Sequence, residues 1–373
     1  MHIVVDRNIR AAPATFGAHA RLSFLDGRDI RRQDLVSADA LLVRTATRVD
    51  AELLEGTPVR FVGSTSIGTD HMDTAWLDSA GIRWANAPGC NADAAAQYTL
   101  AMAWLASARL GRNLQELSVG IVGRGNVGSR VMALFEALGM DVVANDPPLA
   151  EAGVQRLVSL DAVLERDLVC LHTPLTRLGP HPTWRLFNAS VLGAMNDGAL
   201  LLNAGRGDVV DGDALRRELG AGRLAAALDV WPGEPRIDAE ILRASTVATP
   251  HVAGYSDDGK RRGTLMVYRA FCEWAGLAPV EPPGPPWSPA PLRVSAGREG
   301  LGQALEAACF VSRHDAGLRA LAALSMDERA LGFDRLRRDY PPRRDFQAWT
   351  IECPDLESEQ LCHNVGFAAV PVA

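Results

Sequence analysis

Lysine, paired cysteines and long apolar runs are all scarce in this 373-residue chain. Lys260 is the only lysine among 38 basic residues, against 45 acidic residues, and the formal net charge is -7 at pH 7. A nucleic-acid partner requires a basic face, so this charge argues against one. No uninterrupted apolar segment is long enough to span a bilayer, so we expect no membrane partner either.

The cysteines give no sign of a disulfide framework or a metal site. None forms a Cys-x-x-Cys pair, and none is grouped with histidine at the spacing of a zinc site. The apolar start at 2–5 runs directly into Asp6 and Arg7, which is typical of a first strand and not of a targeting segment. We therefore expect a cytoplasmic protein without a metal, with reduced thiols at Cys90, Cys170, Cys272, Cys309, Cys353 and Cys362.

The most informative stretch lies between residues 119 and 146. An apolar run at 119–122 predicts a short buried strand, Gly-Arg-Gly-Asn-Val-Gly follows at 123–128, and 129–138 predicts a helix. A second apolar run then ends at Asp146. A Gly-x-Gly-x-x-Gly alone is a weak signal, and a glycine-rich turn without a ligand is the alternative. Strand, glycines, helix, second strand and acidic end together form a dinucleotide-binding fingerprint.

Each part of this fingerprint has a physical role. Gly123 permits the tight turn, Gly125 lets the backbone approach a pyrophosphate, and Gly128 lets helix and strand pack closely. The helix start, with Asn126 and Val127, presents free N–H groups and a positive dipole to the phosphates. The acidic end would accept hydrogen bonds from a ribose diol and would repel a 2′-phosphate, so NAD is favoured over NADP.

The chain up to about residue 250 alternates short apolar runs with helical stretches, which predicts an α/β fold with doubly wound parallel sheets. An alanine-rich stretch at 92–108 predicts a buried helix that leads into the dinucleotide domain. Before it we expect strands at 3–5, 40–43 and 61–62 and helices at 51–54 and 74–80. After it we expect strands at 119–122, 142–145, 167–171, 199–203, 225–229 and 246–248.

The last part of the sequence changes character. A helix is expected at 258–276, where the chain could return to the first domain. Residues 279–291 are so rich in proline that they predict a linker, because proline fits neither a helix interior nor a central strand. Beyond it, a small folded α+β domain is expected instead of a disordered tail, since apolar residues recur at 301–310, 318–324 and 349–351.

Three polar side chains that follow predicted strands can carry chemistry. Arg206 lies between two glycines, Glu234 lies between glycine and proline, and His251 follows a third strand. The carboxyl ends of strands are where doubly wound sheets hold ligands. Each motif alone is more typical of an ordinary loop. The three in this order, after a dinucleotide fingerprint, favour a functional interpretation.

Together these side chains suit hydride transfer from an alcohol carbon. The reaction needs a base for the hydroxyl proton, and His251 is the residue type suited to that task. Glu234, hydrogen-bonded to the imidazole, would stabilise its protonated form. Arg206 would hold a substrate carboxylate through two parallel N–H bonds and polarise the oxygen at the reacting carbon. We therefore predict these three residues as catalytic.

Over roughly residues 1–280 the sequence resembles the D-isomer-specific 2-hydroxyacid dehydrogenase family. The family implies two flavodoxin-like or Rossmann-like lobes with the active site in their cleft, the first lobe being completed by the returning helix. It also implies that the arginine binds the carboxylate and that the glutamate and histidine form the acid–base pair. The motifs are 123–128, Asn203-Ala204-Gly205-Arg206-Gly207, Asp229-Val230-Trp231, Glu234-Pro235 and Thr249-Pro250-His251.

A narrower resemblance is to one branch of that family, which oxidises a phosphorylated four-carbon sugar acid in pyridoxal phosphate synthesis. It implies NAD as cofactor and a homodimer to which an added C-terminal domain contributes. The motifs that carry it include Val43-Arg44-Thr45, Gly68-Thr69-Asp70-His71, Ala87-Pro88-Gly89-Cys90-Asn91-Ala92, His172-Thr173-Pro174-Leu175 and Ala253-Gly254-Tyr255.

This resemblance also implies a domain plan and further contacts. The expected parts are a substrate-binding lobe of 1–92 plus 253–280, an NAD-binding Rossmann domain of 93–252, a proline-rich linker of 281–291 and a dimerisation domain of 292–373. Thr45, Ser66 and Tyr255 would contact the substrate. The further contacts to NAD would come from Asp146, Thr173, Ala204, Asp229 and Gly254.

The phosphate of such a substrate needs its own donors. Arg44, with the hydroxyls of Thr45, Ser66 and Tyr255, is the predicted set. The cations at 260–262 are a second source, but we interpret them as a solvated helix face.

Two alternatives stay open from the sequence. The same residues could serve another D-2-hydroxyacid dehydrogenase, such as one that oxidises 3-phosphoglycerate or one that reduces glyoxylate to glycolate. The fold also serves in binding proteins, so an NAD-sensing corepressor is an alternative without catalysis. The presence of Arg206, Glu234 and His251 argues against the corepressor.

Overall fold

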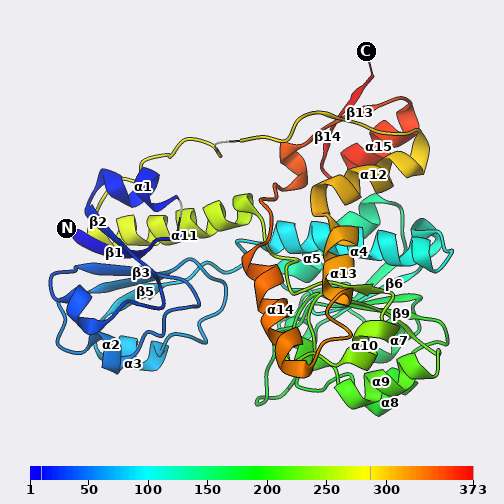
Figure 1. The fold of residues 1–373 in the computed structure, drawn as a ribbon, viewed down its shortest axis with the longest axis horizontal. Coiled ribbons are helices and arrows are strands. Elements are labelled where there is room, and N and C mark those ends of the chain that lie inside the picture. The colour runs from blue at the N-terminus through cyan, green and yellow to red at the C-terminus, as the bar shows by residue number, and fades with distance from the viewer. Residues whose placement is uncertain (10, 286, 373) are drawn as a thin grey trace. The chain divides into compact units, whose positions relative to one another are not determined.

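The computed structural model describes residues 1–9, 11–285 and 287–372. Packing divides the chain into two compact units, Met1–Asn91 with Ser256–Trp287 and Ala92–Tyr255 with Ser288–Ala373. Pro286 of the expected linker and Ala373 of the expected dimerisation domain lie outside the described residues. Figure 1 shows the elements of each unit with the labels used below.

The first unit is built on a five-stranded parallel sheet of order β2-β1-β3-β4-β5. Successive residues of one strand alternate between two hydrophobic clusters: Ala40 and Leu42 belong to one, Leu41 and Val43 to the other. Both faces of the sheet are therefore covered, as continuous apolar runs predict for parallel strands. The strands are β1 (His2–Asp6), β2 (Arg21–Leu25), β3 (Ala40–Val43), β4 (Phe61–Ser64) and β5 (Arg83–Ala85).

Helix α11 (Asp257–Ala275) is the returning helix that the sequence predicts at 258–276. Its N-cap, Ser256, accepts a hydrogen bond from the Gly259 N–H, and it ends at Gly276 with a left-handed φ of 66°. Together with α1 (Ala12–Thr15) it covers one face of the sheet. The other face is covered by α2 (Ala51–Leu54) and α3 (Thr74–Ser79).

The second unit holds a six-stranded parallel sheet of order β11-β10-β9-β8-β6-β7. The strand order reverses between β6 and β8, so the ligand crevice of such a sheet lies at the carboxyl ends of these two strands. Outside β7, the Val158 N–H donates to the Ala144 carbonyl at 2.8 Å, where a Rossmann sheet has one further strand. The strands are β6 (Val119–Val122), β7 (Val142–Asn145), β8 (Leu168–Leu171), β9 (Leu200–Asn203), β10 (Ala225–Leu228) and β11 (Val247–Ala248).

Helices pack on both faces of this sheet as well. The alanine-rich helix α4 (Ala92–Arg109) is buried along most of its length, because it is apolar on nearly every side. It packs against α5 (Asn126–Ala137), the helix that follows the glycine turn. The remaining helices of this part are α6 (Pro147–Glu151), α7 (Leu160–Leu164), α8 (Ala189–Gly193), α9 (Gly212–Gly220) and α10 (Ala239–Ala244).

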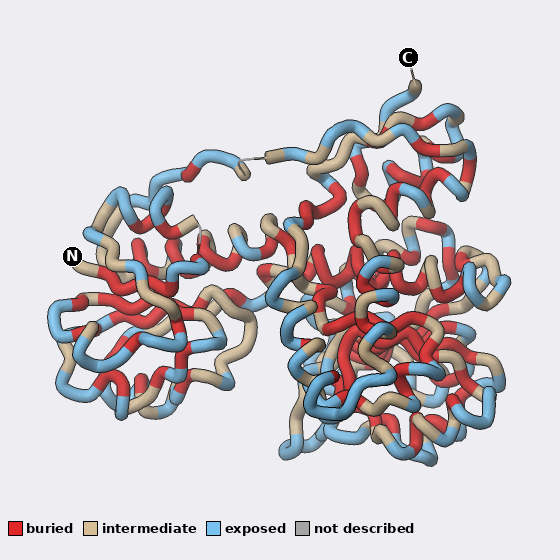
Figure 2. Tube along the Cα trace, in the orientation of Figure 1, coloured by how far each residue is buried: buried red, intermediate tan, exposed pale blue. Residues whose placement is uncertain are grey.

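The region after the linker shares a continuous core with the dinucleotide sheet (Figure 2). Helix α12 (Gly297–Cys309) packs on α4, and α13 (Val311–Arg319) packs on α4 and β11. Leu301 and Met102 belong to the same hydrophobic cluster. The region also has its own parallel sheet of order β12-β13-β14. Its other elements are β12 (Leu292–Arg293), α14 (Met326–Arg338), β13 (Thr350–Cys353), α15 (Leu356–Asn364) and β14 (Ala368–Pro371).

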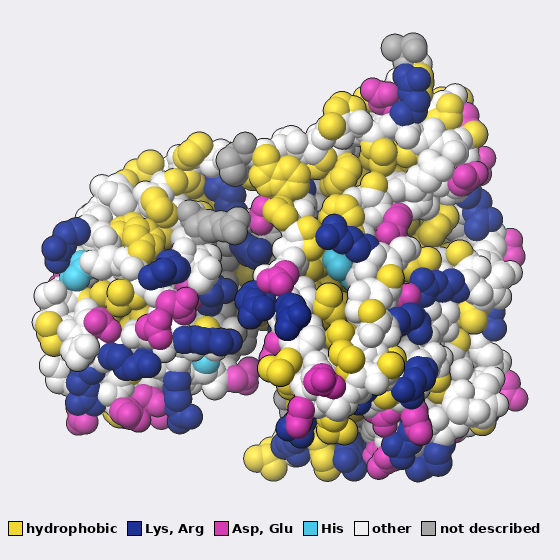
Figure 3. All heavy atoms as spheres, in the orientation of Figure 1, with side chains coloured by type: hydrophobic (Ala, Val, Ile, Leu, Met, Phe, Trp, Pro, Cys, Tyr) yellow, Lys and Arg dark blue, Asp and Glu magenta, His cyan; other side chains and the backbone are white. Residues whose placement is uncertain are grey.

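The predicted α/β fold class is confirmed, with two doubly wound parallel sheets. Every strand expected in the second sheet forms within one residue of its expected ends. The sequence did not predict β2 and β5, the edge strands of the first sheet, because an edge strand is half-exposed and lacks a long apolar run. In Figure 3, basic and acidic side chains are mixed on the visible face of each unit. Within the described ranges, no helix combines the length and apolar character needed to cross a membrane.

Candidate active site

The glycine turn after β6 leaves no room for side chains at two positions. Gly123 has a φ of +91°, and a Cβ on it would lie 2.9 Å from backbone atoms of His172 and Thr173. A Cβ on Gly128 would lie 1.8 Å from the Gly123 carbonyl oxygen. Any side chain at either glycine would push the strand, the turn and α5 apart, so these two residues shape the turn.

Gly125 differs from them because no described atom lies within 4 Å of where its Cβ would be. It is the N-cap of α5, with a φ of -73° and a ψ of -150°. Asn126 and Val127 follow in the first turn, whose N–H groups have no acceptor within the helix. Open space, free donors and the positive end of a 12-residue helix fit the pyrophosphate of a dinucleotide.

Asp146 follows β7 and organises the loop beside the glycine turn. One carboxylate oxygen accepts the Leu149 N–H at 3.2 Å and the other accepts the Arg124 N–H at 2.8 Å. Each oxygen keeps a lone pair for a ribose hydroxyl. The side chain of Arg124 donates to the Gln155 carbonyl at 2.9 Å.

The loop after β8 places unpartnered polar atoms beside the glycine turn. Within the described part of the chain, neither ring nitrogen of His172 has a hydrogen-bond partner, and neither does Oγ1 of Thr173. Burial lowers the pKa of His172 to about 4, so its ring is neutral at pH 7. Buried polar atoms without partners fit a site that a ligand completes. His172 lies within one of the sequence motifs, but sequence reasoning gave it no role. The local sequence does not show whether a buried histidine has a hydrogen-bond partner.

Arg206 is held by a tight turn after β9. The Asn203 side chain accepts the Gly205 N–H at 3.0 Å and donates to the Arg206 carbonyl at 3.0 Å. A Cβ on Gly207 would lie 1.9 Å from the Trp231 carbonyl oxygen, so only glycine lets this turn lie against the loop after β10. The Arg206 side chain is exposed, and its Nη1 donates to the Gly205 carbonyl at 2.8 Å. The strand end therefore presents a guanidinium to solvent.

A buried carboxylate, Asp229, fixes the loop that carries His251. It accepts hydrogen bonds from Oγ1 of Thr249 at 2.6 Å and from the N–H groups of Val252 and Ala253 at 2.9 Å each. The His251 N–H donates to the Asp229 carbonyl at 2.7 Å. Asp229 thus has a positioning role that the sequence did not reveal, besides the NAD contact that the resemblance implies.

Glu234 and His251 form a direct pair. Nδ1 of His251 hydrogen-bonds to Oε1 of Glu234, and Oε2 of Glu234 accepts the Trp231 N–H at 3.1 Å. The indole N–H of Trp231 donates to the Thr249 carbonyl at 2.9 Å, which ties the two loops together. The side chains of the pair are 24% and 28% exposed, so they are shielded but reachable.

The electrostatics of this pair set the proton positions. Burial alone would raise the pKa of Glu234, but the hydrogen bond and charge of His251, the Trp231 N–H and the charge of Arg337 together bring that pKa below its usual value. Glu234 is therefore ionised at pH 7, so the proton of a neutral His251 lies on Nδ1. Nε2 then carries a lone pair that can accept a substrate proton.

The structure brings Arg206, Glu234 and His251 together at one sheet edge. All three follow parallel strands, β9, β10 and β11, which are neighbours in the sheet. Gly254 and Tyr255 follow His251 in the same unit, and Ala204 follows β9. Arg206, Glu234 and His251 can therefore serve one reaction centre. Among the described residues, no group of His, Cys, Asp or Glu has the arrangement of a metal site.

The other predicted substrate residues lie in the first unit. Arg44 follows β3, and its Nε is 3.0 Å from Oδ2 of the buried Asp6. Thr45 is exposed and Ser66 is half-buried. Asp6 thus accepts hydrogen bonds from the Nε and Nη2 atoms of the Arg44 guanidinium.

The cations at 260–262 lie along α11 and have partners within the first unit. Nζ of Lys260 is 3.8 Å from Asp257, Arg261 donates to the Pro282 carbonyl at 2.9 Å, and Arg262 donates to the Cys90 carbonyl at 2.9 Å. These contacts give the cluster a structural role.

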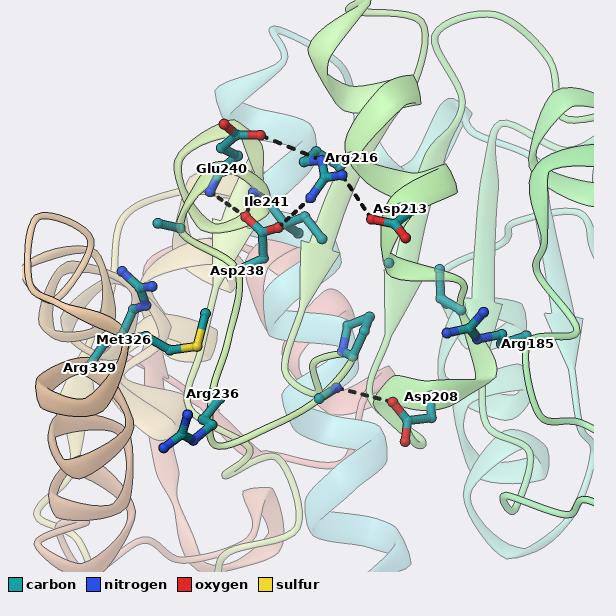
Figure 4. Close-up of a pocket in the computed structure, with 15 residues that line it drawn as sticks. Arg185, Asp208, Asp213, Arg216, Arg236, Asp238, Glu240, Ile241, Met326 and Arg329 are labelled. Carbon is teal, nitrogen blue, oxygen red and sulfur yellow. Dashed lines mark hydrogen bonds and ion pairs between the residues drawn. The ribbon is translucent and has the colours of Figure 1, made fainter.

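The second unit also contains a pocket (Figure 4). It is lined by α9, the start of α10 and the start of α14, and it contains none of the three predicted catalytic residues. Two of its arginines are ion-paired: Arg216 with Asp213 and Asp238, and Arg236 with Asp327. The side chains of Arg216 and Arg236 therefore offer no unpaired charge to a small ligand.

Comparison with known proteins places this geometry in a family. Residues 90–253 match the model of the D-isomer specific 2-hydroxyacid dehydrogenase, NAD binding domain. Erythronate-4-phosphate dehydrogenase of Teredinibacter turnerae is 43% identical over 98% of this chain and 97% of its own length. The protein of the same name from Marinobacter nauticus is 44% identical, covering 94% of each chain.

The fold has a solved counterpart with bound ligands. The crystal structure of D-lactate dehydrogenase from Aquifex aeolicus, complexed with NAD and lactic acid, covers 74% of this chain and 96% of that chain with 25% identity and a TM-score of 0.59. The predicted NAD cofactor is confirmed by the family model and by such neighbours. The chain belongs to the erythronate-4-phosphate dehydrogenase family, within the D-isomer specific 2-hydroxyacid dehydrogenases.

Proposed function

We propose that this protein oxidises 4-phospho-D-erythronate with NAD to the 2-oxo acid, 3-hydroxy-2-oxo-4-phosphonooxybutanoate. The observation that carries the proposal is the convergence of Arg206 and the Glu234–His251 pair at the strand ends beside the glycine turn. The curated relatives carry the name of this reaction over nearly their full lengths. The names of these relatives favour neither an NAD-sensing corepressor nor a dehydrogenase for another 2-hydroxy acid. As the resemblance implies, the reaction serves pyridoxal phosphate synthesis.

Bound NAD supplies the acceptor for the hydride that leaves C2. Nε2 of His251 takes the proton from the C2 hydroxyl as the carbon–oxygen double bond forms. The adjacent carboxylate of Glu234 stabilises the imidazolium that results, and the proton later leaves to solvent. In the reverse direction the same imidazolium returns the proton.

Arg206 binds and orients the substrate. Its guanidinium forms two parallel N–H bonds with the C1 carboxylate and polarises the C2 oxygen as it gains double-bond character. Holding the carboxylate fixes C2 next to the cofactor, which supplies the proximity that hydride transfer needs. Thr45, Ser66, Tyr255 and Arg44 are further substrate contacts in this proposal.

Residues along the crevice of the second sheet hold NAD. The turn at 123–128, with the N–H groups of Asn126 and Val127, binds the pyrophosphate, and Asp146 binds the ribose. Thr173, Ala204, Asp229 and Gly254 complete the set.

The C-terminal region, 292–373, is proposed to form a homodimer interface, and the protein is proposed to work in the cytoplasm. The six cysteines are all unpaired and buried, which suits a reducing compartment.

A spectrophotometric assay with 4-phospho-D-erythronate and NAD tests the function. A keto acid is included as acceptor, so that turnover is seen even if the reduced cofactor stays bound. We expect turnover of the phosphorylated four-carbon acid well above that of 3-phosphoglycerate and glycolate. Turnover of either rival at an equal or higher kcat/KM would overturn the substrate assignment, and no turnover of any acid would overturn the enzyme assignment.

A further inference from the structure

Helix α14, in the C-terminal region, turns one face toward the loop that carries Glu234. Nε of Arg329 donates to the Ile237 carbonyl at 2.9 Å. Phe333 is fully buried and belongs to the same hydrophobic cluster as Trp231 and Ile237. Arg337 follows at the next position of this helical spacing, so its side chain leaves α14 on the same face.

Arg337 is held close to the catalytic loops. Its guanidinium lies over the Phe333 ring, 5.8 Å from the ring centre. Its Nη2 donates to the hydroxyl of Tyr255 at 3.4 Å, in the loop that also carries His251. Its positive charge is also one of the influences on the Glu234 carboxylate. Two loops of the site, those after β10 and β11, therefore have Arg337 as a neighbour.

The hydrogen-bonding capacity of Arg337 is largely unused. Within the described part of the chain, its Nε is buried without a hydrogen-bond partner, and no carboxylate forms an ion pair with its guanidinium. By contrast, Arg338, one position along, is 72% exposed and lies 3.3 Å from Asp339. A partly buried guanidinium without a carboxylate partner favours an anion from outside the chain.

We propose that Arg337 binds the phosphate of the substrate, so that the C-terminal region completes the active site and selects a phosphorylated acid. This inference rests on the proposed function, which supplies a substrate with a carboxylate at one end and a phosphate monoester at the other. Arg206 holds the first anion. Arg337 holds the second, because its planar fork matches phosphate oxygens and Asp6 leaves Arg44 with little free charge.

This arrangement explains how an unphosphorylated acid is rejected. Such an acid leaves Arg337 without its counter-anion, and a site built for a polar group discriminates strongly against the analogue that lacks it. The hydroxyl of Tyr255, already within reach of Nη2, supplies a neutral donor beside the same phosphate.

The test compares Arg337→Met with the matched variant Arg338→Met, which removes the same charge from the same helix turn. For each protein kcat/KM is measured with 4-phospho-D-erythronate and with D-erythronate, using NAD and a keto-acid acceptor. We expect Arg337→Met to lose on the order of 100-fold with the phosphorylated acid, mainly through KM, and less than about 3-fold with D-erythronate. Arg338→Met should keep both values within about 2-fold, and Arg337→Lys should fall between.

A second measurement covers the case in which D-erythronate turns over too slowly. Inorganic phosphate should inhibit the wild type competitively with 4-phospho-D-erythronate, and its inhibition constant should rise at least about 10-fold in Arg337→Met. NAD affinity and the melting temperature should be unchanged in that variant.

The outcomes are distinguishable from those that test the proposed function. If the wild type does not oxidise 4-phospho-D-erythronate, the proposed function fails. If the wild type does so but Arg337→Met keeps its preference for the phosphorylated acid, or loses both acids equally, phosphate binding by Arg337 is wrong. An unchanged inhibition constant for inorganic phosphate contradicts it as well.

Discussion

The two sheets share a strand order but differ at their carboxyl ends. Both begin with the order 2-1-3-4-5 when each is counted from its own first strand, so both offer a crevice beside the first strand. In the second sheet that strand ends in the glycine turn and a 12-residue helix. In the first sheet it ends at a buried carboxylate, Asp6, and the next helix has four residues.

This difference shows that the strand order supplies only a place for a ligand. At that place the second sheet has backbone N–H donors without acceptors and polar side-chain atoms without hydrogen-bond partners. In the first sheet, Asp6 lies at the corresponding place, where it pairs with Arg44 and accepts the Asn8 N–H at 2.9 Å. The proposed cofactor site and acid–base pair therefore belong to the second sheet, and the residues predicted in the first unit are proposed as substrate contacts alone.

The largest effect is expected from His251→Asn. Losing the base at the end of β11 should lower kcat by about 10³-fold, within the usual range for general base catalysis. NAD affinity should stay within about 3-fold, because the asparagine leaves the glycine turn untouched. Steady-state kinetics and a fluorescence titration of NADH measure the two quantities. A collapse of cofactor affinity would mean that His251 is structural.

The next effect compares the arginine that follows β9 of the second sheet with the arginine that follows β3 of the first sheet. Arg206→Ala should reduce kcat/KM by about 10²- to 10³-fold, since it removes the partner of the substrate carboxylate. Arg44→Ala should cost less than about 10-fold, because Asp6 already offsets its charge. Equal losses, or a larger loss for Arg44→Ala, would reverse our assignment of the two guanidiniums.

A pair of glycine variants separates cofactor binding from packing. Gly125→Val should weaken NAD binding more than about 10-fold with an unchanged melting temperature, because a side chain there meets the ligand and no described protein atom. Gly63→Val should instead lower the melting temperature and leave NAD binding unchanged. A Cβ on Gly63 would lie 2.3 Å from Val267, so we expect a loss of about 1–3 kcal/mol in the free energy of unfolding.

Calorimetry and NADH titration on both proteins provide the check. If Gly125→Val melts early while binding NAD normally, the open face of the glycine turn is not the pyrophosphate site.

The smallest effect concerns pH. The folded-state pKa of His172, about 4, lies below the unfolded value of about 6.5, so the unfolded chain binds more protons between these limits. Stability of the second unit should therefore fall as pH drops from 6.5 to 4, by about 1.4 kcal/mol per pH unit at most from this residue. His172→Leu should flatten that slope in unfolding measured without NAD. An unchanged slope would mean that His172 is already protonated in the folded chain.

Most of the second sheet could be predicted from sequence because its strands are buried on both faces and end at glycine or polar residues. The chemistry could be predicted as well, because the turn at 123–128 and the side chains of Arg206, Glu234 and His251 all follow such strands. The edge strands β2 and β5 were missed because they lack apolar runs.

The missed site residues depend on contacts between distant parts of the chain. Nothing near Asp229 in sequence shows that it anchors the loop of His251, and nothing near Arg44 shows that Asp6 pairs with it. Arg337 resembles the other arginines of its helix until the structure shows that it is partly buried and that its Nε has no hydrogen-bond partner. The C-terminal region also looked separate in sequence, but the structure joins its core to that of the dinucleotide sheet.

Transfer of deuterium from C2 tests the central claim most directly. 4-Phospho-D-erythronate labelled with deuterium at C2 is incubated with the enzyme and NAD, and the reduced cofactor is released and analysed by mass spectrometry. We predict that the wild type places the label on the nicotinamide ring and that His251→Asn does so far more slowly with NAD bound. Reduced cofactor without deuterium, or an equal rate in the variant, would contradict the account.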